Sequence, residues 1–473
     1  MPLSYFDTKT CMDYTENNYF IKKLEPDSFL ITTEHGAWVV LNREEYKLLR
    51  LNRVHEDPNL FHSLEDKGVI ITERNIDYIV NTYRLRKAYL FSGVNLHIIA
   101  VTSKCNHRCS YCFTGLQKNR RDMDEDMAKG VVDFIFQSPN PAISMEISGG
   151  EPLMNFPVVE FIIEYSKKLN KKFRRDLVYT IVTNLASMDE DILRYLMKNN
   201  VSISTSLDGP KEVHDRNRKY LNGSSSYEKT VYWIDVIKED HKYPLLGALP
   251  VITRHSLPYG KEIADEYIKH DLDCLRLKYI APTGNAQKRW DKLGYTPDEY
   301  LVLWKQVLDY ILKLNGKGLE FNEGLTTLML KKIILNIDPH YVDLNMPCGA
   351  GIGQITYDEK GNIYTCDEAR PYEIFKLGVA DKNRYKEIIA SRTVMSMVDI
   401  SSGYPLMCDF CAWKPYCGVC GVISYAQQGN LIPKLPLDFR CAIHKGMFEH
   451  VFRKLLFSKE RTIFMKWVDM PRF

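Results

Sequence analysis

Three closely spaced cysteines constrain this chain more than any other feature. Cys105, Cys109 and Cys112 form a C-x3-C-x2-C motif directly after the apolar run 96–102. That run has the length and composition of a buried strand, so we expect the thiols on the loop that leaves it. Three thiolates are one short of a closed four-ligand site, so a four-iron cluster here would keep one iron open. The alternative is a zinc knuckle in which His107, inside the same loop, is the fourth ligand.

The composition is that of an ordinary globular protein. The chain has 473 residues, of which 45% are hydrophobic, and a net charge of +3, so nothing indicates nucleic acid or a membrane as partner. The N-terminus lacks the basic start and apolar core of a signal peptide, and we expect a cytoplasmic protein. In a reducing compartment the 12 cysteines indicate metal binding or catalysis. Ten of them fall into two groups, and we expect Cys11 and Cys274 to be ordinary buried thiols.

The first 90 residues predict a small unit of their own. A strand hairpin, two short helices and a helical linker are expected at 27–33, 37–41, 42–49, 59–68 and 75–87. This order is winged-helix-like. Such a unit either has a binding role or is a packing appendage without one.

Strand-like and helix-like segments then alternate, which predicts an α/β fold with a parallel sheet, in the form of a partial (β/α)6 barrel. The expected strands are 96–102, 142–147, 177–182, 201–206, 244–252 and 274–280. The expected helices are 124–137, 157–169, 189–198, 227–239 and 259–270, with further helices at 297–314 and 324–336. Ligands of such folds bind at the carboxyl ends of the strands.

Polar motifs stand at those strand ends. Gly149 and Gly150 follow the second strand and allow backbone to approach a ligand closely, and Glu151 can accept a hydrogen bond from an ammonium group. Asn184 ends the third strand. The fourth strand ends at Ser206, and Arg218 follows. Both are candidate ligand contacts, but a strand-end cap or a surface ion pair explains each of them equally well.

A second group of seven cysteines lies in the last third of the chain, at Cys348, Cys366, Cys408, Cys411, Cys417, Cys420 and Cys441. Seven thiolates are one short of two four-ligand clusters. A structural zinc ribbon over 408–420 is the alternative. Asp367 follows Cys366 directly and is a candidate base, as is Glu368, although both are equally explained as solvated loop carboxylates.

The first motif, with an aromatic residue before its last cysteine, resembles the signature of radical S-adenosylmethionine (SAM) enzymes. The resemblance implies a [4Fe-4S] cluster on Cys105, Cys109 and Cys112 whose open iron binds the amino and carboxylate groups of SAM. Reductive cleavage of SAM then gives a 5'-deoxyadenosyl radical. An external electron donor such as flavodoxin or ferredoxin is implied as partner.

The strand-end segments resemble further motifs of that family. Residues 148–152 resemble the GGEP motif, in which Glu151 would hold the SAM amino group, and Asn184 lies in a segment that resembles the family's Thr-Asn segment. Residues 206–218 resemble a block of peptide and sulfatase maturases. By that resemblance Ser206 and Arg218 would serve the ribose and the carboxylate of SAM.

The second cysteine group resembles the SPASM domain, apart from one gap of two residues, between Cys417 and Cys420, where three is usual. The resemblance implies two auxiliary [4Fe-4S] clusters, which makes three clusters in all. One would be held by Cys408, Cys411, Cys417 and Cys441, and the other by Cys348, Cys366 and Cys420. The fourth position of the second cluster is either open or filled by a residue such as Cys11. In sulfatase-maturing relatives a proton-accepting aspartate occupies the position of Asp367.

Together these resemblances predict a leader-peptide recognition domain at 1–90, a radical SAM core at 91–320 and a SPASM domain with a C-terminal helix at 321–473. The N-terminal unit resembles domains, similar to the pyrroloquinoline quinone chaperone, that bind the leader of a precursor peptide along a hairpin edge. The expected function is to install a thioether, carbon-carbon or similar crosslink in a ribosomally made precursor peptide. Of named groups, the chain most resembles the maturases of His-Xaa-Ser peptide systems, because the N-terminal block through the cysteine loop has their layout. The alternatives are a sulfatase-type maturase that oxidises Cys or Ser to formylglycine, and an electron-carrying or zinc-binding scaffold that is not an enzyme.

Overall fold

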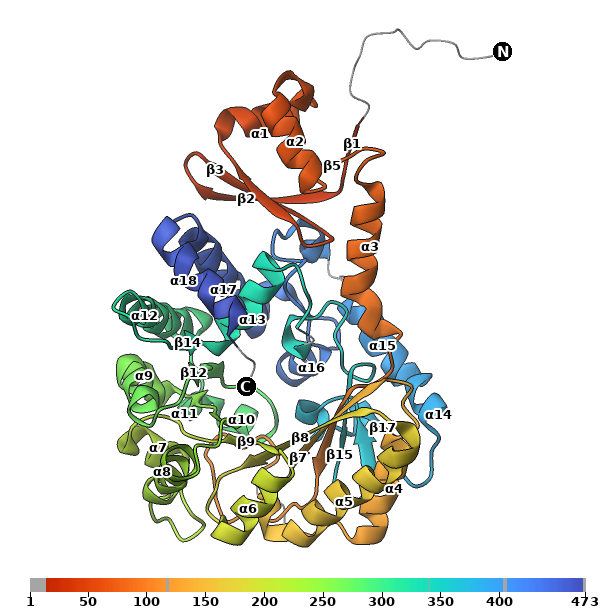
Figure 1. Cartoon of the computed structure of the whole chain (residues 1–473), viewed down its shortest axis with the longest axis vertical. Helices are drawn as coiled ribbons and strands as arrows, with labels where there is room; N and C mark the ends of the chain where they lie inside the picture. Colours follow the sequence, from red (N-terminus) through yellow and green to blue (C-terminus); the bar gives the residue numbers. More distant parts are fainter. Residues whose placement is uncertain (1–13, 116–118, 340, 403–405, 471–473) are drawn as a thin grey trace.

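The structure, a computed structural model, describes residues 14–115, 119–339, 341–402 and 406–470. Its centre is an eight-stranded sheet with the strand order β10-β9-β8-β7-β6-β15-β16-β17 (Figure 1). Neighbouring strands from β10 to β15 in this order are parallel, whereas β15, β16 and β17 pair antiparallel. The strands are β6 (Leu96–Ala100), β7 (Ala142–Ser148), β8 (Asp176–Thr183), β9 (Ser202–Thr205), β10 (Leu246–Ala248), β15 (Gln354–Tyr357), β16 (Asn362–Tyr364) and β17 (Lys376–Val379).

The predicted α/β fold with a parallel sheet is therefore confirmed, and the first four predicted strands are β6 to β9. The last two predicted strands are each divided. The segment 244–252 forms β10 and β11 (Val251–Ile252), and 274–280 forms β12 (Cys274–Leu275) and β13 (Lys278–Tyr279). Strands β11, β12 and β13 lie outside the large sheet, because β11 pairs with β13, and β12 pairs with β14 (Asn322–Glu323).

The helices between the strands are α4 (Glu125–Ile135), α5 (Phe156–Phe173), α6 (Glu190–Lys198), α7 (Lys211–Asn217), α8 (Tyr227–Asp235), α9 (Gly260–Lys269), α10 (Gly284–Lys288), α11 (Trp290–Leu293), α12 (Pro297–Asn315) and α13 (Gly324–Ile334). The predicted helices are all present, as α4, α5, α6, α8, α9, α12 and α13, whereas the short helices α7, α10 and α11 were not predicted. Side-chain caps fix several starts; Asp124 and Asp189, for example, accept hydrogen bonds from backbone N–H groups in the first turns of α4 and α6. Figure 1 shows α4, α5 and α6 along one side of the sheet.

The C-terminal third is built into this core. Its strands β15 to β17 continue the large sheet beside β6, an arrangement that the spacing of the cysteines does not predict. The remaining helices are α14 (Tyr385–Ile389), α15 (Arg392–Ser401), α16 (Gly421–Gln428), α17 (Phe439–Leu455) and α18 (Ser458–Asp469). The segment that carries the second cysteine group is thus attached to the first parallel strand by backbone hydrogen bonds.

The N-terminal unit contains the expected hairpin, β3 and β4, and three further strands. Its elements are β1 (Thr15–Glu16), β2 (Tyr19–Glu25), β3 (Ser28–Thr33), β4 (Trp38–Leu41), α1 (Arg43–Arg50), α2 (Pro58–Asp66), β5 (Ile70–Ile71) and α3 (Ile76–Lys87). Strand β2 was missed because an irregular register between Lys23 and Glu25 interrupts the alternation of apolar and polar residues. The sheet order β2-β3-β4 makes β4 an edge strand.

This N-terminal sheet packs on the C-terminal part of the chain. Ile31 and Leu41 belong to a local core with α1 and α2, whereas Leu30 joins the large core. The Trp38 indole donates a hydrogen bond to the Ile333 carbonyl (2.9 Å), and its ring meets Phe452 edge-on with the centroids 5.4 Å apart. The sheet therefore lies between its own helices and α17 (Figure 1). Among the described helices we find none with both the length and the apolar character needed to span a bilayer.

We expect Trp38→Ala to lower the free energy of unfolding by about 2–4 kcal/mol, since it removes a large, partly buried side chain and leaves the Ile333 carbonyl unpaired. Urea-induced unfolding measures the change. The matched control is Phe91→Ala, because the Phe91 side chain is 89% exposed and its loss should cost less than about 0.5 kcal/mol. Equal effects of the two substitutions would show that the docking of β4 does not depend on Trp38.

Candidate functional site

A cavity of about 1850 Å³ opens at the carboxyl ends of the parallel strands. It is lined by the loops after β6, β7, β8 and β9 and by the start of the second cysteine segment. The predicted site residues on its wall are Cys105, Cys109, Cys112, Gly149, Gly150, Glu151, Asn184, Ser206, Arg218, Cys348, Cys366, Asp367 and Cys420. Cys408, Cys411, Cys417 and Cys441 are not part of this wall. One cavity thus brings together residues that are more than 300 positions apart in the sequence.

The glycine pair after β7 packs against the backbone of the cysteine loop. Gly150 donates a hydrogen bond to the Thr102 carbonyl (2.7 Å), and the Glu151 N–H donates to the Lys104 carbonyl (2.8 Å). A Cβ on Gly150 would lie 2.0 Å from the Lys104 oxygen, and Gly149 has a φ of +149°. Glycine is required at position 150 because the atom that a Cβ would meet is the Lys104 carbonyl oxygen, which belongs to the backbone and cannot move aside.

Glu151 joins this loop to the end of β8. Its carboxylate accepts hydrogen bonds from the Thr183 hydroxyl (2.5 Å) and from the Asn184 N–H (2.8 Å). Burial raises the pKa of Glu151 to about 7, although these hydrogen bonds act in the opposite direction. The Asn184 side chain in turn donates to the Asn106 side chain (2.8 Å), inside the cysteine loop. Glu151 and Asn184 thus order the strand ends around the three thiols.

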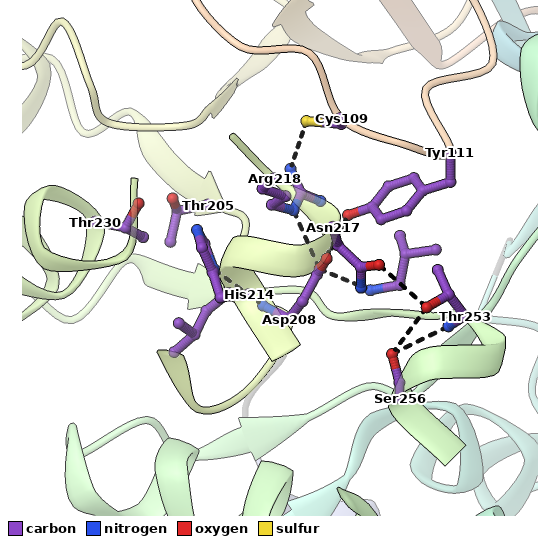
Figure 2. Close-up of polar contacts among 12 residues, drawn as sticks. Cys109, Tyr111, Thr205, Asp208, His214, Asn217, Arg218, Thr230, Thr253 and Ser256 are labelled. Atoms are coloured by element: carbon purple, nitrogen blue, oxygen red, sulfur yellow. Dashed lines mark hydrogen bonds and ion pairs between the residues drawn. The ribbon is translucent and has the colours of Figure 1, made fainter. Parts of the chain in front are cut away.

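Arg218 is held by a buried carboxylate that sequence reasoning did not single out. Its Nε lies 3.1 Å from Asp208, which is fully buried and also accepts from the Tyr111 hydroxyl (2.9 and 3.0 Å) and the Val251 N–H (3.1 Å). The guanidinium carbon lies 5.1 Å from the centre of the Tyr111 ring, and Nη1 lies 3.9 Å from the Cys109 sulfur. Figure 2 shows Arg218 between Asp208 and Cys109. Arg218 thus forms a buried ion pair with Asp208 at the cysteine loop, and not the surface ion pair considered in the sequence analysis.

The network continues beyond Asp208. Asn217 precedes Arg218 and accepts a hydrogen bond from the Thr253 hydroxyl (3.1 Å), and Ser256 caps the same turn (Figure 2). A signal for Asp208 was available in the sequence, because a charged residue directly after the apolar end of a strand needs a partner if it is buried.

His107 lies in the cysteine loop without a polar partner. Its ring is buried against Tyr220, edge to face at 4.8 Å, and neither ring nitrogen has a hydrogen-bond partner among the described residues. Burial lowers the pKa of His107 to about 3, so the ring is neutral at pH 7. Within the described part of the chain, no three Cys, His, Asp or Glu side chains gather tightly enough for a single metal ion. A four-iron cluster makes a different demand, since each thiolate binds a different iron.

The second cysteine group divides into two sets in space. Burial, together with the nearby thiols of Cys411 and Cys441, raises the pKa of Cys408 to about 12. Burial likewise raises the pKa of Cys417, and the thiols of Cys441, Cys411 and Cys408 contribute. Cys408, Cys411, Cys417 and Cys441 thus lie near one another, and they are the four cysteines that the SPASM resemblance assigns to one cluster. The ring nitrogen Nδ1 of His444, on α17, lies 3.4 Å from the Cys417 sulfur.

Cys348, Cys366 and Cys420 form the other set, on the cavity wall. Burial raises the pKa of Cys366 well above its usual range, and the thiols of Cys420 and Cys348 add to the rise. Cys11, the suggested fourth ligand, lies outside the described residues. Cys274 differs from the expectation of an ordinary core thiol, because it is only partly buried and lines the cavity.

The two candidate bases beside Cys366 are both engaged. The Arg370 Nε lies 2.8 Å from Asp367 Oδ1, and the Lys278 Nζ lies 3.6 Å from Glu368 Oε1. Sequence reasoning missed a third carboxylate, Glu146, which lines the cavity from β7. Burial and the nearby Asp367 raise the pKa of Glu146 to about 7. The alternation in β7 was the available signal, since Ser144 and Glu146 interrupt its apolar residues with period two.

We expect Asp208→Asn to lower the free energy of unfolding by about 3–5 kcal/mol, because it leaves the Arg218 guanidinium buried without a counter-charge. The control is Asp191→Asn, which removes an exposed Asp–Arg pair with Arg194 and should cost less than about 1 kcal/mol. Chemical denaturation of the two variants measures both changes. Similar losses would contradict the view that Asp208 holds the site together.

Comparison with known proteins gives this geometry a context. Residues 99–272 match the family described as the radical SAM superfamily. The chain is 24% identical over 381 residues to the cysteine-type anaerobic sulfatase-maturating enzyme of Clostridium novyi (strain NT), which covers 77% of this chain and 97% of that protein. The structure of native anSMEcpe with bound AdoMet and Cp18Cys peptide has a TM-score of 0.67 at 22% identity, over 78% of this chain and 99% of that one.

A second fold likeness covers more of the chain. Streptococcus suis SuiB, in its crystal structure bound to the precursor peptide SuiA, has a TM-score of 0.54 at 16% identity, over 89% of this chain and 98% of that one. The cysteine loop, the glycine pair and the Asp208–Arg218 network all lie within the matched residues 99–272. The chain is a radical SAM enzyme.

Proposed function

We propose that this enzyme modifies a ribosomally made precursor peptide by radical chemistry and installs a thioether or carbon-carbon crosslink. The observation that carries the proposal is the single cavity whose wall contains thiols of both cysteine groups. A peptide segment in that cavity would contact the SAM site on one side and an auxiliary cluster on the other. The structures of anSMEcpe with a bound peptide and of SuiB with SuiA support a peptide as substrate.

The residues of the cysteine loop fit a SAM-binding cluster. Cys105, Cys109 and Cys112 supply three sulfur donors on one cavity wall, and the loop is held by backbone contacts that leave no room for a larger residue at Gly150. SAM bound to the fourth iron would supply the 5'-deoxyadenosyl radical that removes a hydrogen atom from the substrate. Glu151, Asn184, Ser206 and Arg218, with Gly149 and Gly150, would orient SAM beside the loop.

In this proposal Arg218 and Glu151 act with their partners. Asp208 fixes the Arg218 side chain, so the guanidinium reaches SAM and the Cys109 thiolate without losing side-chain freedom at binding. Glu151 keeps its carboxylate in place through Thr183 and the Asn184 backbone, and its remaining acceptor capacity is available to an ammonium group.

The seven remaining cysteines would hold two auxiliary [4Fe-4S] clusters. We assign Cys408, Cys411, Cys417 and Cys441 to one, and Cys348, Cys366 and Cys420 to the other, which has three protein thiolates. The mutual proximity of the thiols within each set supports this assignment. These clusters would accept an electron or bind substrate. An external donor such as flavodoxin or ferredoxin would supply the electron that starts the reaction.

We further propose that residues 1–90 recognise a leader peptide, that 91–320 form the radical SAM core, and that 321–473 form a SPASM domain. Strand β4 is one of the two edges of the N-terminal sheet, so its outward backbone groups can pair with an added strand. A role in His-Xaa-Ser peptide systems is a finer prediction that rests on the layout of the N-terminal block through the cysteine loop.

A sulfatase-type maturase is the second candidate. The similarity to the Clostridium novyi enzyme favours it, as does the position of Asp367 on the cavity wall next to Cys366. In this reading Asp367 would accept the proton that the oxidised side chain releases. The two candidates differ in product, since a crosslink and a formylglycine change the peptide mass differently.

The test uses synthetic peptides encoded by small open reading frames beside the gene for this chain. We expect Val40→Pro to weaken binding of the leader-containing peptide by at least about tenfold, because the pairing of Thr33 with Ala37 places the Val40 N–H on the outer side of β4. Val40→Ala is the matched control, since it removes the same packing and keeps the N–H. Fluorescence anisotropy gives the affinities, and mass spectrometry after reaction with SAM gives the product. Equal affinities of the two variants would refute recognition along β4, and peptides left unmodified by the wild type would refute the proposed function.

A further inference from the structure

We propose that Arg276 is a substrate-recognition residue that binds a carboxylate of the peptide inside the cavity. This inference rests on the proposed peptide function and adds the chemical class of substrate. The carboxylate would come either from an Asp or Glu side chain or from the free C-terminus of a peptide.

Arg276 reaches the cavity through the alternation of an extended segment. Cys274, Arg276 and Lys278 all line the cavity, whereas Leu275 and Leu277 between them are fully buried in the core. Strands β12 and β13, which flank Arg276, are anchored to β14 and β11. The position of its Cα on the cavity wall is therefore set by strand pairing.

The Arg276 side chain is also held in place. A Cβ on Gly324, the first residue of α13, would lie 3.2 Å from both Cβ and Nε of Arg276, so its stem lies directly on the glycine. The guanidinium carbon lies 5.6 Å from the centre of the Tyr341 ring. A guanidinium fixed between a glycine and an aromatic face loses little freedom when it binds an anion.

Among the described cations of the cavity wall that are not exposed, Arg276 differs in having no acidic partner. Arg218, Lys278, Arg370 and Lys376, which are also not fully exposed, form ion pairs with Asp208, Glu368, Asp367 and Glu373. For Arg276 we find no ion pair within the described part of the chain, and its Nε is buried without a hydrogen-bond partner there. Glu146, on β7, is within electrostatic range of Arg276 but does not form an ion pair with it.

Arg276 is partly buried, and its buried Nε is costly unless a ligand completes it. Its planar donors match a carboxylate in a bidentate arrangement, which makes a carboxylate the best fit among peptide groups. The SAM carboxylate is the competing anion, but Arg218 lies beside the cysteine loop and Arg276 lies on the β12 and β13 side of the cavity. The geometry therefore favours the substrate as the source.

The experiment measures retention of peptides by the cluster-loaded, SAM-bound enzyme. The probes are pools of N-acetylated heptapeptides that contain no other acidic residue. The first pool has a central Asp and a C-terminal amide, the second a central Asn and an amide, and the third a central Asn and a free C-terminus. A fourth, amidated pool has a central Lys. Ultrafiltration followed by mass spectrometry quantifies each pool, and equilibrium dialysis gives the affinity for SAM.

We expect the wild type to retain the first or the third pool about tenfold better than the second, which also identifies the source of the carboxylate. Arg276→Gln should abolish this preference without changing the affinity for SAM, and Arg276→Glu should favour the Lys pool instead. The control is Lys376→Gln, which removes a cavity cation that already has an acidic partner and should keep the preference. Iron content and thermal unfolding of each variant report on folding.

Several results would overturn the inference. Equal retention of all pools by the wild type refutes the carboxylate subsite and leaves the peptide function standing. A preference that survives in Arg276→Gln assigns recognition to other residues, and a loss of SAM affinity in that variant assigns Arg276 to SAM. Failure to retain any pool refutes the subsite and counts against the proposed peptide function as well.

Discussion

The contact between two backbone segments, 102–104 and 149–151, is the constraint on which the site depends. Two N–H groups of the glycine segment bind carbonyls of the cysteine loop, and a side chain at Gly150 would collide with that backbone. The contact is possible because β6 and β7 are parallel neighbours whose carboxyl ends meet at one edge of the sheet. Glu151 then extends the order to β8, and Asp208 with Arg218 extends it from β9 to Cys109. Each strand end thus contributes one fixed contact to a loop that carries three thiols.

The same sheet also places the second cysteine group. Because β15 pairs with β6, the chain that carries Cys348 and Cys366 is attached to the strand that leads into Cys105. The N-terminal sheet packs on the C-terminal helices, so it is connected to the same rigid body through Trp38 and Tyr416. These contacts join the N-terminal sheet to the C-terminal part of the chain in addition to the covalent connection through α3.

The sequence was sufficient for the parallel strands and the loop motifs, because alternating apolar segments and cysteine spacing are local signals. It was not sufficient for pairings between distant segments. The attachment of β15 to β6 joins residues about 250 positions apart, and the bulge in β2 hides its alternation. Arg218 was recognised as a candidate, but its partner Asp208 follows from burial that only the fold establishes. The unpaired state of Arg276 has the same origin, since it depends on which carboxylates the fold brings near.

The central claim is that the chain holds three clusters, and that the one on Cys105, Cys109 and Cys112 shares a reaction cavity with the one on Cys348, Cys366 and Cys420. Iron and sulfide per chain after anaerobic reconstitution test it most directly, in the wild type and in a Cys105→Ala, Cys109→Ala, Cys112→Ala triple variant. The account predicts about twelve irons in the wild type and about eight in the variant, with SAM cleavage abolished. About four irons in the wild type, all lost in the variant, would contradict it, because the second cysteine group would then hold no clusters.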